Sequence, residues 1–189
     1  QFDPYKGNVE ILLSLRNKRH IHFIKQDVYD QEKLLIGTGD KDHESTILSY
    51  DLDTGCLEVI GGGSQDWRAV SILQKGDYLY WGSDCPYKQN YICRYNRHTN
   101  WLEKIQPIPG PAYYSAINSE GRMFLATTVE RRREHRAVIY SSVDGATWIE
   151  EKEWKKDILP EKLFGYGTIE FIHGQEALRK VFINLRGLK

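Results

Sequence analysis

Short apolar runs separated by polar residues recur along this chain at a nearly constant spacing. The first phrase starts at Leu34 and reads LLIGTGD, a gap, and then ILSYDLDTGCLEVI; similar phrases start at Leu79 and Met123. Tyr50 and Tyr95 hold the same place in the first two copies and lie 45 residues apart. Self-similarity at a period of this length is typical of an array of similar structural units.

Each unit is expected to consist of β-strands. Its apolar runs are short, rich in Val, Ile, Tyr, Phe and Trp, and interrupted by Gly, Asp, Asn and Ser, which is a strand pattern. One more apolar run precedes each phrase, at His22, Arg68, Tyr113 and Gly167, so a complete unit has four strands. Four antiparallel strands at this period describe one blade of a β-propeller. We therefore predict an all-β fold of four-stranded antiparallel blades.

The predicted blades span about residues 20–64, 65–109 and 110–158, followed by a partial blade at 159–189. The run from Asn8 to Leu15 is interpreted as an edge strand of a closing blade, and the run from Lys180 as a second strand with nothing after it. The chain is then a propeller of about four blades with the last incomplete, or a fragment of a larger propeller. Open strand edges predict self-association or further chain segments that complete the ring.

Charge and composition narrow the choice of partner. Basic and acidic side chains number 26 each, which gives a formal net charge of zero and argues against a nucleic-acid binder. No apolar stretch reaches the roughly 20 residues that span a bilayer, so no membrane span is expected. This chain shows no signal-peptide pattern, and an extracellular and a cytoplasmic location both stay open.

Cys85 and Cys93 flank a predicted turn and are candidates for facing each other across a hairpin. Reduced thiols packed in the core are the default expectation. His43 stands between Asp42 and Glu44, but adjacent charged residues in a hairpin loop are usually solvated. The sequence therefore predicts no metal site and no cofactor.

One turn carries a motif that can be named. Residues 142–148 read SVDGATW, with Ser142, Asp144, Gly145, Thr147 and Trp148 at the defining positions. This pattern resembles the Asp-box, or BNR repeat, of sialidase-like and glycosidase-like propellers, in its shortened form. The Asp side chain is expected to accept N–H groups of its own turn, Gly to supply a positive φ, and Trp to pack into the blade. The motif is thus a structural device, and the matching turns at 53–55 and 98–101 keep only part of it.

Strand alternation predicts which polar residues meet. Asp40, Asp84 and Glu130 end the second strand of successive blades, so they are expected around one mouth and are the candidate catalytic residues. The links between blades open on the same side. They add the candidate substrate-binding residues His22, Trp67, Arg68, Tyr113, Tyr114 and Tyr166.

Carboxylates, an Arg and aromatic rings together suit a carbohydrate site, because they pair with hydroxyl groups, anionic groups and apolar sugar faces respectively. The resemblance implies binding of an oligosaccharide or polysaccharide, with glycoside hydrolysis as the reaction if the protein is an enzyme. Structural roles stay open for each residue, since acids are common in turns, Trp67 can fill the space between blades, and Tyr pairs suit half-buried strands. The alternative function is a non-catalytic propeller scaffold that mediates protein–protein interaction.

Overall fold

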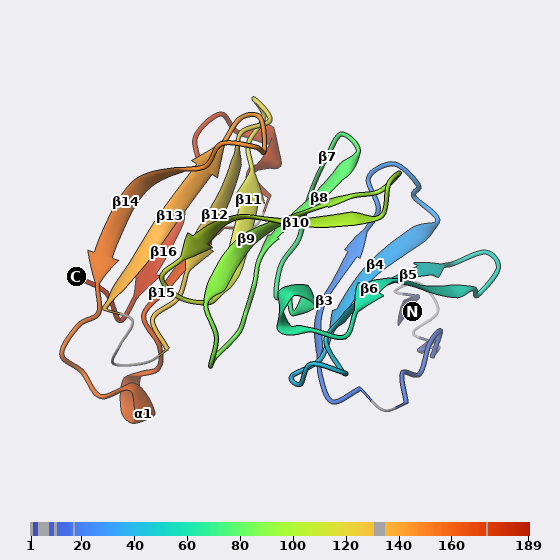
Figure 1. Ribbon diagram of the computed structural model, residues 1–189, viewed down its shortest axis with the longest axis horizontal. Coiled ribbons are helices and arrows are strands. Elements are labelled where there is room, and N and C mark those ends of the chain that lie inside the picture. Colours follow the sequence, from blue (N-terminus) through green and yellow to red (C-terminus); the bar gives the residue numbers. More distant parts are fainter. Residues whose placement is uncertain (1, 4–7, 10, 17, 131–134, 173) are drawn as a thin grey trace.

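The computed structural model describes residues 2–3, 8–9, 11–16, 18–130, 135–172 and 174–189. Three four-stranded antiparallel sheets and two smaller, two-stranded sheets make up the described chain, as Figure 1 shows. Helical structure in the described residues is limited to η1 (Gln65–Trp67), α1 (Glu161–Phe164) and η2 (Gln175–Ala177). The predicted all-β class with four-stranded antiparallel sheets is confirmed.

Strands follow each other in chain order within every four-stranded sheet. The first sheet contains β3 (Ile21–Gln26), β4 (Lys33–Thr38), β5 (Thr46–Asp51) and β6 (Leu57–Gly62). The second contains β7 (Leu73–Lys75), β8 (Tyr78–Gly82), β9 (Asn90–Asn96) and β10 (Trp101–Ile108). The third contains β11 (Ala112–Ile117), β12 (Met123–Thr127), β13 (Arg136–Ser142) and β14 (Ile149–Lys155). A two-stranded sheet of β15 (Thr168–Phe171) and β16 (Ile183–Arg186) follows.

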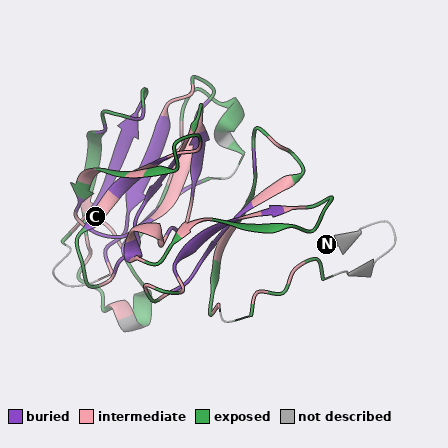
Figure 2. Ribbon diagram, turned by 45° about the vertical axis from the view of Figure 1, so that its right-hand side comes forward, coloured by how far each residue is buried: buried purple, intermediate pink, exposed green. Residues whose placement is uncertain are grey.

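The apolar core lies between successive sheets. Leu35 and Ile47 of the first sheet pack with Leu79 and Trp81 of the second. Tyr80 and Ile92 of the second sheet pack with residues of the third, including Leu125, Val138 and Trp148. Phe124 and Ile139 of the third pack with Ile169 and Phe171 of β15. Figure 2 shows buried residues along the inner strands and exposed ones along edge strands such as β14, which is the burial expected of sheets stacked face to face.

The N-terminal segment differs from the prediction. Among the described residues of the predicted strand from Asn8 to Leu15, Asn8–Val9 (β2) alone form a strand, which pairs with β1 (Phe2–Asp3). Residues 11–15 have no regular structure. Leu13 and Leu15 instead cover Ile36, Leu48 and Tyr50 on the outer face of the first sheet. The alternating leucines are thus explained by packing onto a sheet face and not by strand pairing.

The predicted strand beginning at Arg68 is also interrupted. Ala69 forms an isolated bridge with Ser83, and regular pairing in β7 begins only at Leu73. Trp67 explains the interruption, because its ring packs against Trp81 and Tyr95 with centroids 5.5 Å apart in each case. The backbone before β7 therefore follows the 3₁₀ turn that places this ring.

All three cysteines are free, with Cys85 and Cys93 buried and Cys56 exposed. Cys93 pairs with Trp81 in the sheet register, whereas Cys85 lies in the following loop, where its sulfur accepts a hydrogen bond from Lys88 N. Burial raises the pKa of the Cys93 thiol far above its usual range, so this thiol is inert.

The turns that join the last two strands of each four-stranded sheet share one construction. Asp51, Asn96 and Ser142 stand at equivalent positions, and each side-chain oxygen accepts the N–H of the residue three positions later. Each turn also contains a residue with positive φ, which is Gly55 in the first, Asn100 in the second and Gly145, one position earlier relative to the capping residue, in the third. Such capped turns fix where the edge strand starts.

In the third of these turns, Asp144 makes the hydrogen bonds predicted for it. Its Oδ1 accepts N–H groups from Ala146 at 2.9 Å and Thr147 at 2.8 Å, and these bonds lower the pKa of Asp144. Trp148 is buried and donates its Nε1–H to Gly145 O at 3.2 Å. This turn therefore serves the fold.

Candidate functional site

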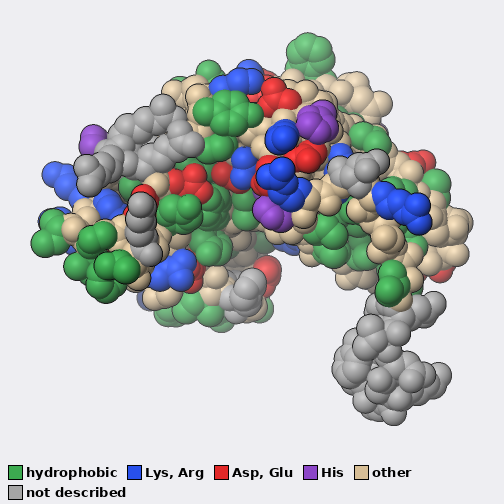
Figure 3. Space-filling view, turned by 90° about the horizontal axis from the view of Figure 1, so that it is seen from below, with side chains coloured by type: hydrophobic (Ala, Val, Ile, Leu, Met, Phe, Trp, Pro, Cys, Tyr) green, Lys and Arg blue, Asp and Glu red, His purple; other side chains and the backbone are tan. Residues whose placement is uncertain are grey.

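An open depression of about 710 Å³ lies beside the loops that follow β4 and β8, the second strands of the first two four-stranded sheets. Figure 3 shows that Lys, Arg, Asp, Glu and His side chains gather on one face of the molecule. Five of the predicted site residues line the depression, namely His22, Asp40, Arg68, Asp84 and Tyr113. Lys18, Arg19, His20 and the apolar residues Leu15, Ile21 and Val70 complete its wall. We call this feature the central depression.

Three of these residues come from equivalent places in successive repeats. His22, Arg68 and Tyr113 each stand where the chain enters a new sheet. His22 and Tyr113 are the extra residues at register shifts between β3 and β4 and between β11 and β12. Such β-bulges turn a side chain away from the regular alternation. The repeat therefore places one side chain from the start of each four-stranded sheet, namely His22, Arg68 and Tyr113, in the wall of the central depression.

Arg68 links two of the predicted carboxylates. Its Nε lies 3.0 Å from Asp84 Oδ2, although this N–H is not aligned as a hydrogen bond. Its Nη2 lies 3.5 Å from Asp40 Oδ1, and its Nη1 donates to the backbone oxygen of Asp40 at 3.3 Å. The Arg68 side chain is only 15% exposed. A guanidinium held in this way is preorganised, because little side-chain freedom is left to lose when a ligand binds.

Asp84 is the most perturbed carboxyl group of the depression. Burial raises its pKa to about 7; Arg68 opposes this rise, and the negative charges of Glu130 and Asp40 add to it. Asp40 and Glu130 are thus both close enough to influence the Asp84 carboxyl group. A perturbed carboxyl group in a depression is a candidate for proton transfer.

Asp40 has the opposite electrostatic environment. Burial alone would raise its pKa, but the hydrogen bond from His20 and the positive charge of Arg68 outweigh burial and lower it. Its carboxylate also lies 3.7 Å from Arg19 Nη1 and 3.8 Å from His22 Nε2. Burial and the charge of Arg68 lower the pKa of His22. At neutral pH the depression therefore combines an ionised Asp40, a neutral His22 and a carboxyl group, Asp84, that is ready to exchange its proton.

Other predicted residues lie elsewhere. Trp67 packs in the core between the first two sheets, and Tyr114 packs toward β15, where its hydroxyl lies 3.3 Å from Glu170 Oε1. Neither lines the central depression, and neither does Tyr166, which is 43% exposed. Glu130 follows β12 and lies near enough to affect Asp84, but it is not part of the wall.

Sequence reasoning missed His20, Lys18 and Arg19. A signal for His20 was present, because His20 and His22 are two residues apart at the start of a predicted strand, and residues at that spacing share a face of a strand. Lys18 and Arg19 gave no such signal, because they lie in a segment without regular structure, where strand alternation does not apply.

No protein-family description matches the chain, and no curated protein matches it. Solved structures with a similar fold include the following two. An auxiliary nutrient binding protein from Bacteroides thetaiotaomicron has a TM-score of 0.53 at 10% identity, over 89% of this chain and 43% of that one. TolB from Acinetobacter baumannii has a TM-score of 0.50 at 11% identity, over 82% of this chain and 40% of that one.

At such low sequence identity, these structural similarities are evidence for the fold alone. They place the chain among propeller-like all-β proteins, and it spans less than half the length of either structure. Within the described residues, no helix has both the length and the apolar character required to cross a membrane.

Proposed function

We propose that the central depression binds an acidic carbohydrate. The observation that carries the proposal is the position of Arg68 between Asp40 and Asp84, at the wall of an open depression. An Arg fixed in this way can pair with a carboxylate or sulfate of a sugar, while neighbouring carboxyl groups accept hydroxyl hydrogens.

The remaining wall supports the same ligand class. Lys18 and Arg19 add positive charge, and Tyr113 offers an aromatic ring for an apolar sugar face. Glycoside hydrolysis is the reaction that these carboxyl groups would support, because Asp84 holds its proton near neutral pH and a second carboxylate, Asp40 or Glu130, lies nearby. A scaffold that binds a protein partner is the alternative, but a depression with a buried carboxyl group favours a small polar ligand.

A glycan array tests the proposal. We expect the protein to bind acidic glycans, and we expect Arg68→Ala to weaken binding at least about tenfold at low salt, with a smaller loss at high salt because charge attraction is screened. Arg94→Ala is the matched control, since Arg94 is a similarly shielded arginine that is paired with Glu103 outside the depression. Thermal unfolding of both variants reports whether the fold is retained.

Either of two outcomes would overturn the proposal. One is that the folded protein binds no glycan on the array. The other is that Arg68→Ala and Arg94→Ala, both folded, bind glycans as the unmodified protein does, which would place the ligand away from the central depression.

A further inference from the structure

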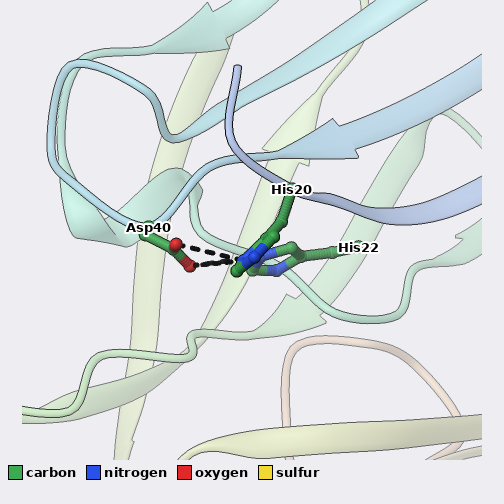
Figure 4. A group of neighbouring side chains, drawn as sticks. All are labelled: His20, His22 and Asp40. Carbon is green, nitrogen blue, oxygen red and sulfur yellow. Dashed lines mark hydrogen bonds and ion pairs between the residues drawn. The ribbon is translucent and has the colours of Figure 1, made fainter.

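We propose that His20, His22 and Asp40 bind a divalent transition-metal ion at the wall of the central depression, with zinc as the ion that this donor set fits well. Figure 4 shows both imidazole rings directed toward the Asp40 carboxylate. One ligand atom from each residue lies within 4.8 Å of the other two. Two imidazoles and a carboxylate are donors that zinc and its neighbours in the first transition series accept.

The distances suit an ion with little rearrangement. His20 Nδ1 lies 3.2 Å from Asp40 Oδ1, and His22 Nε2 lies 3.8 Å from the same oxygen. Ligand bonds of about 2.1 Å in a tetrahedral site separate the donor atoms by roughly 3.4 Å. These two separations bracket that value, and all three donor atoms lie within 4.8 Å of one another, so side-chain movements would bring them to bonding distance.

The placement of His22 supports the same site. Its side chain is only 9% exposed, and its Nε2 atom faces the Asp40 carboxylate. Because packing already holds the imidazole in this orientation, little side-chain freedom is left to lose when an ion binds. The β-bulge at this residue directs the ring toward the depression and away from the regular strand alternation.

Two guanidinium groups near Asp40 oppose a cation, and their placement limits the effect. The Arg19 side chain is 55% exposed, so solvent screens its charge and it is free to turn away. Arg68 is also paired with Asp84, which offsets part of its positive charge. Three protein ligands leave coordination positions open toward the depression, which is the pattern of a site that binds a further ligand on its metal.

Metal binding is measured with zinc chloride by equilibrium dialysis, and with cobalt chloride by visible absorption. We expect one tightly bound ion per chain and the absorption of a tetrahedral cobalt site. His20→Ala, His22→Ala and Asp40→Asn should each weaken binding at least about tenfold, since loss of an outer partner alone commonly has that effect. His20→Ala is the safest of the three for folding because its side chain is 60% exposed.

His98→Ala is the matched control. His98 Nε2 also lies 3.0 Å from an aspartate, Asp77, but these two residues are not part of a group of three donor residues among those described, so the variant should bind metal normally. Absence of a stoichiometric ion in the folded protein would overturn the proposal, as would full binding by His20→Ala and His22→Ala. The probe is the metal ion alone, so a failure to bind glycans would leave this proposal standing, and the reverse also holds.

Discussion

At the scale of single residues, Asp84 is buried where ionisation of its carboxyl group is unfavourable. Asp84 has a side chain that is 4% exposed, and burial raises its pKa to about 7 despite Arg68. The raised pKa means that the folded protein keeps a proton which the unfolded chain releases at lower pH. The residue therefore weakens the fold at neutral pH, and a residue that costs stability is a candidate for function.

This argument predicts how stability depends on pH. Stability from the protonated Asp84 is fully present below the carboxyl group's ordinary pKa of 3.8 and is lost as pH rises to the folded value of about 7. The free energy of unfolding of the unmodified protein, relative to Asp84→Asn, should fall by up to about 1.4 kcal/mol per pH unit in that window and level off above it. Urea unfolding from pH 4 to 8 measures the difference.

Parallel pH profiles for Asp84→Asn and the unmodified protein would contradict this prediction, because they would show that Asp84 is ionised throughout, held by Arg68.

At the scale of elements, the turn between β13 and β14 depends on one glycine for two reasons. Gly145 has a φ of 75°, and a Cβ at this position would overlap the Tyr80 ring of the second sheet. Gly76 also has a positive φ, 55°, but a Cβ added to Gly76 would meet no other atom within 4 Å. Substituting alanine for each of these glycines therefore separates the energetic cost of backbone strain from that of steric overlap.

We expect Gly76→Ala to lower the free energy of unfolding by about 1 kcal/mol, from the left-handed backbone alone. Gly145→Ala should cost a further 1 to 3 kcal/mol, roughly, because the new methyl group must displace the packed Tyr80. Chemical denaturation of both variants provides the comparison. Equal losses would mean that Tyr80 moves aside freely and that the contact between the sheets is loose.

A buried ion pair joins the first sheet to the second. Asp27, after β3, is 1% exposed and pairs through both carboxylate oxygens with Arg97, after β9. Burial would raise the pKa of Asp27, but the hydrogen bonds from Arg97 and from Tyr29 N outweigh it and the pKa is lowered. Its contribution to stability is therefore present above the ordinary aspartate pKa and is lost as pH falls through the lowered value.

Removal of Arg97 tests this link. Arg97→Ala leaves a buried carboxylate without its main partner and should destabilise the fold by about 3 kcal/mol at pH 7. Arg94→Ala breaks a more exposed pair with Glu103 and should cost less than about 1 kcal/mol. Both arginines also lie over a tyrosine ring, so the control removes a similar contact. Similar losses for the two variants would show that the buried pair contributes no more than a surface pair.

The same elements show what the sequence could predict. Repeat spacing and strand alternation place Asp40, Asp84 and Arg68 together without any knowledge of contacts, because equivalent positions in stacked sheets meet at one face. They do not predict that Tyr113 and Tyr114 point to different surroundings, since the register shift falls between Ala112 and Tyr114, and one extra residue reverses the alternation. The role of Trp67 could not be predicted either, because a tryptophan in a connection between two sheets is compatible with a ligand site and with the apolar core.

At the scale of the whole molecule, the sheets at the two ends of the described array have one neighbour each. The outer face of the first sheet carries Ile36, Leu48 and Tyr50, and the segment of residues 11–16 lies on it. The Tyr50 hydroxyl donates a hydrogen bond to Leu12 O at 3.0 Å, which holds the segment in place. In a longer array this face is the kind of surface on which a further sheet packs, so the segment substitutes for a neighbouring sheet.

The substitution can be tested by making the covering segment polar. In the double variant Leu13→Asp and Leu15→Asp, two half-buried apolar contacts are lost, which should lower the free energy of unfolding by roughly 1 kcal/mol for each residue. The uncovered apolar face should also promote self-association, measured by sedimentation velocity. Ile11→Asp is the control, because Ile11 is 82% exposed, and it should change neither property. If the double variant stays monomeric and as stable as the control, the segment does not shield the sheet, and the first sheet is stable with that face open to water.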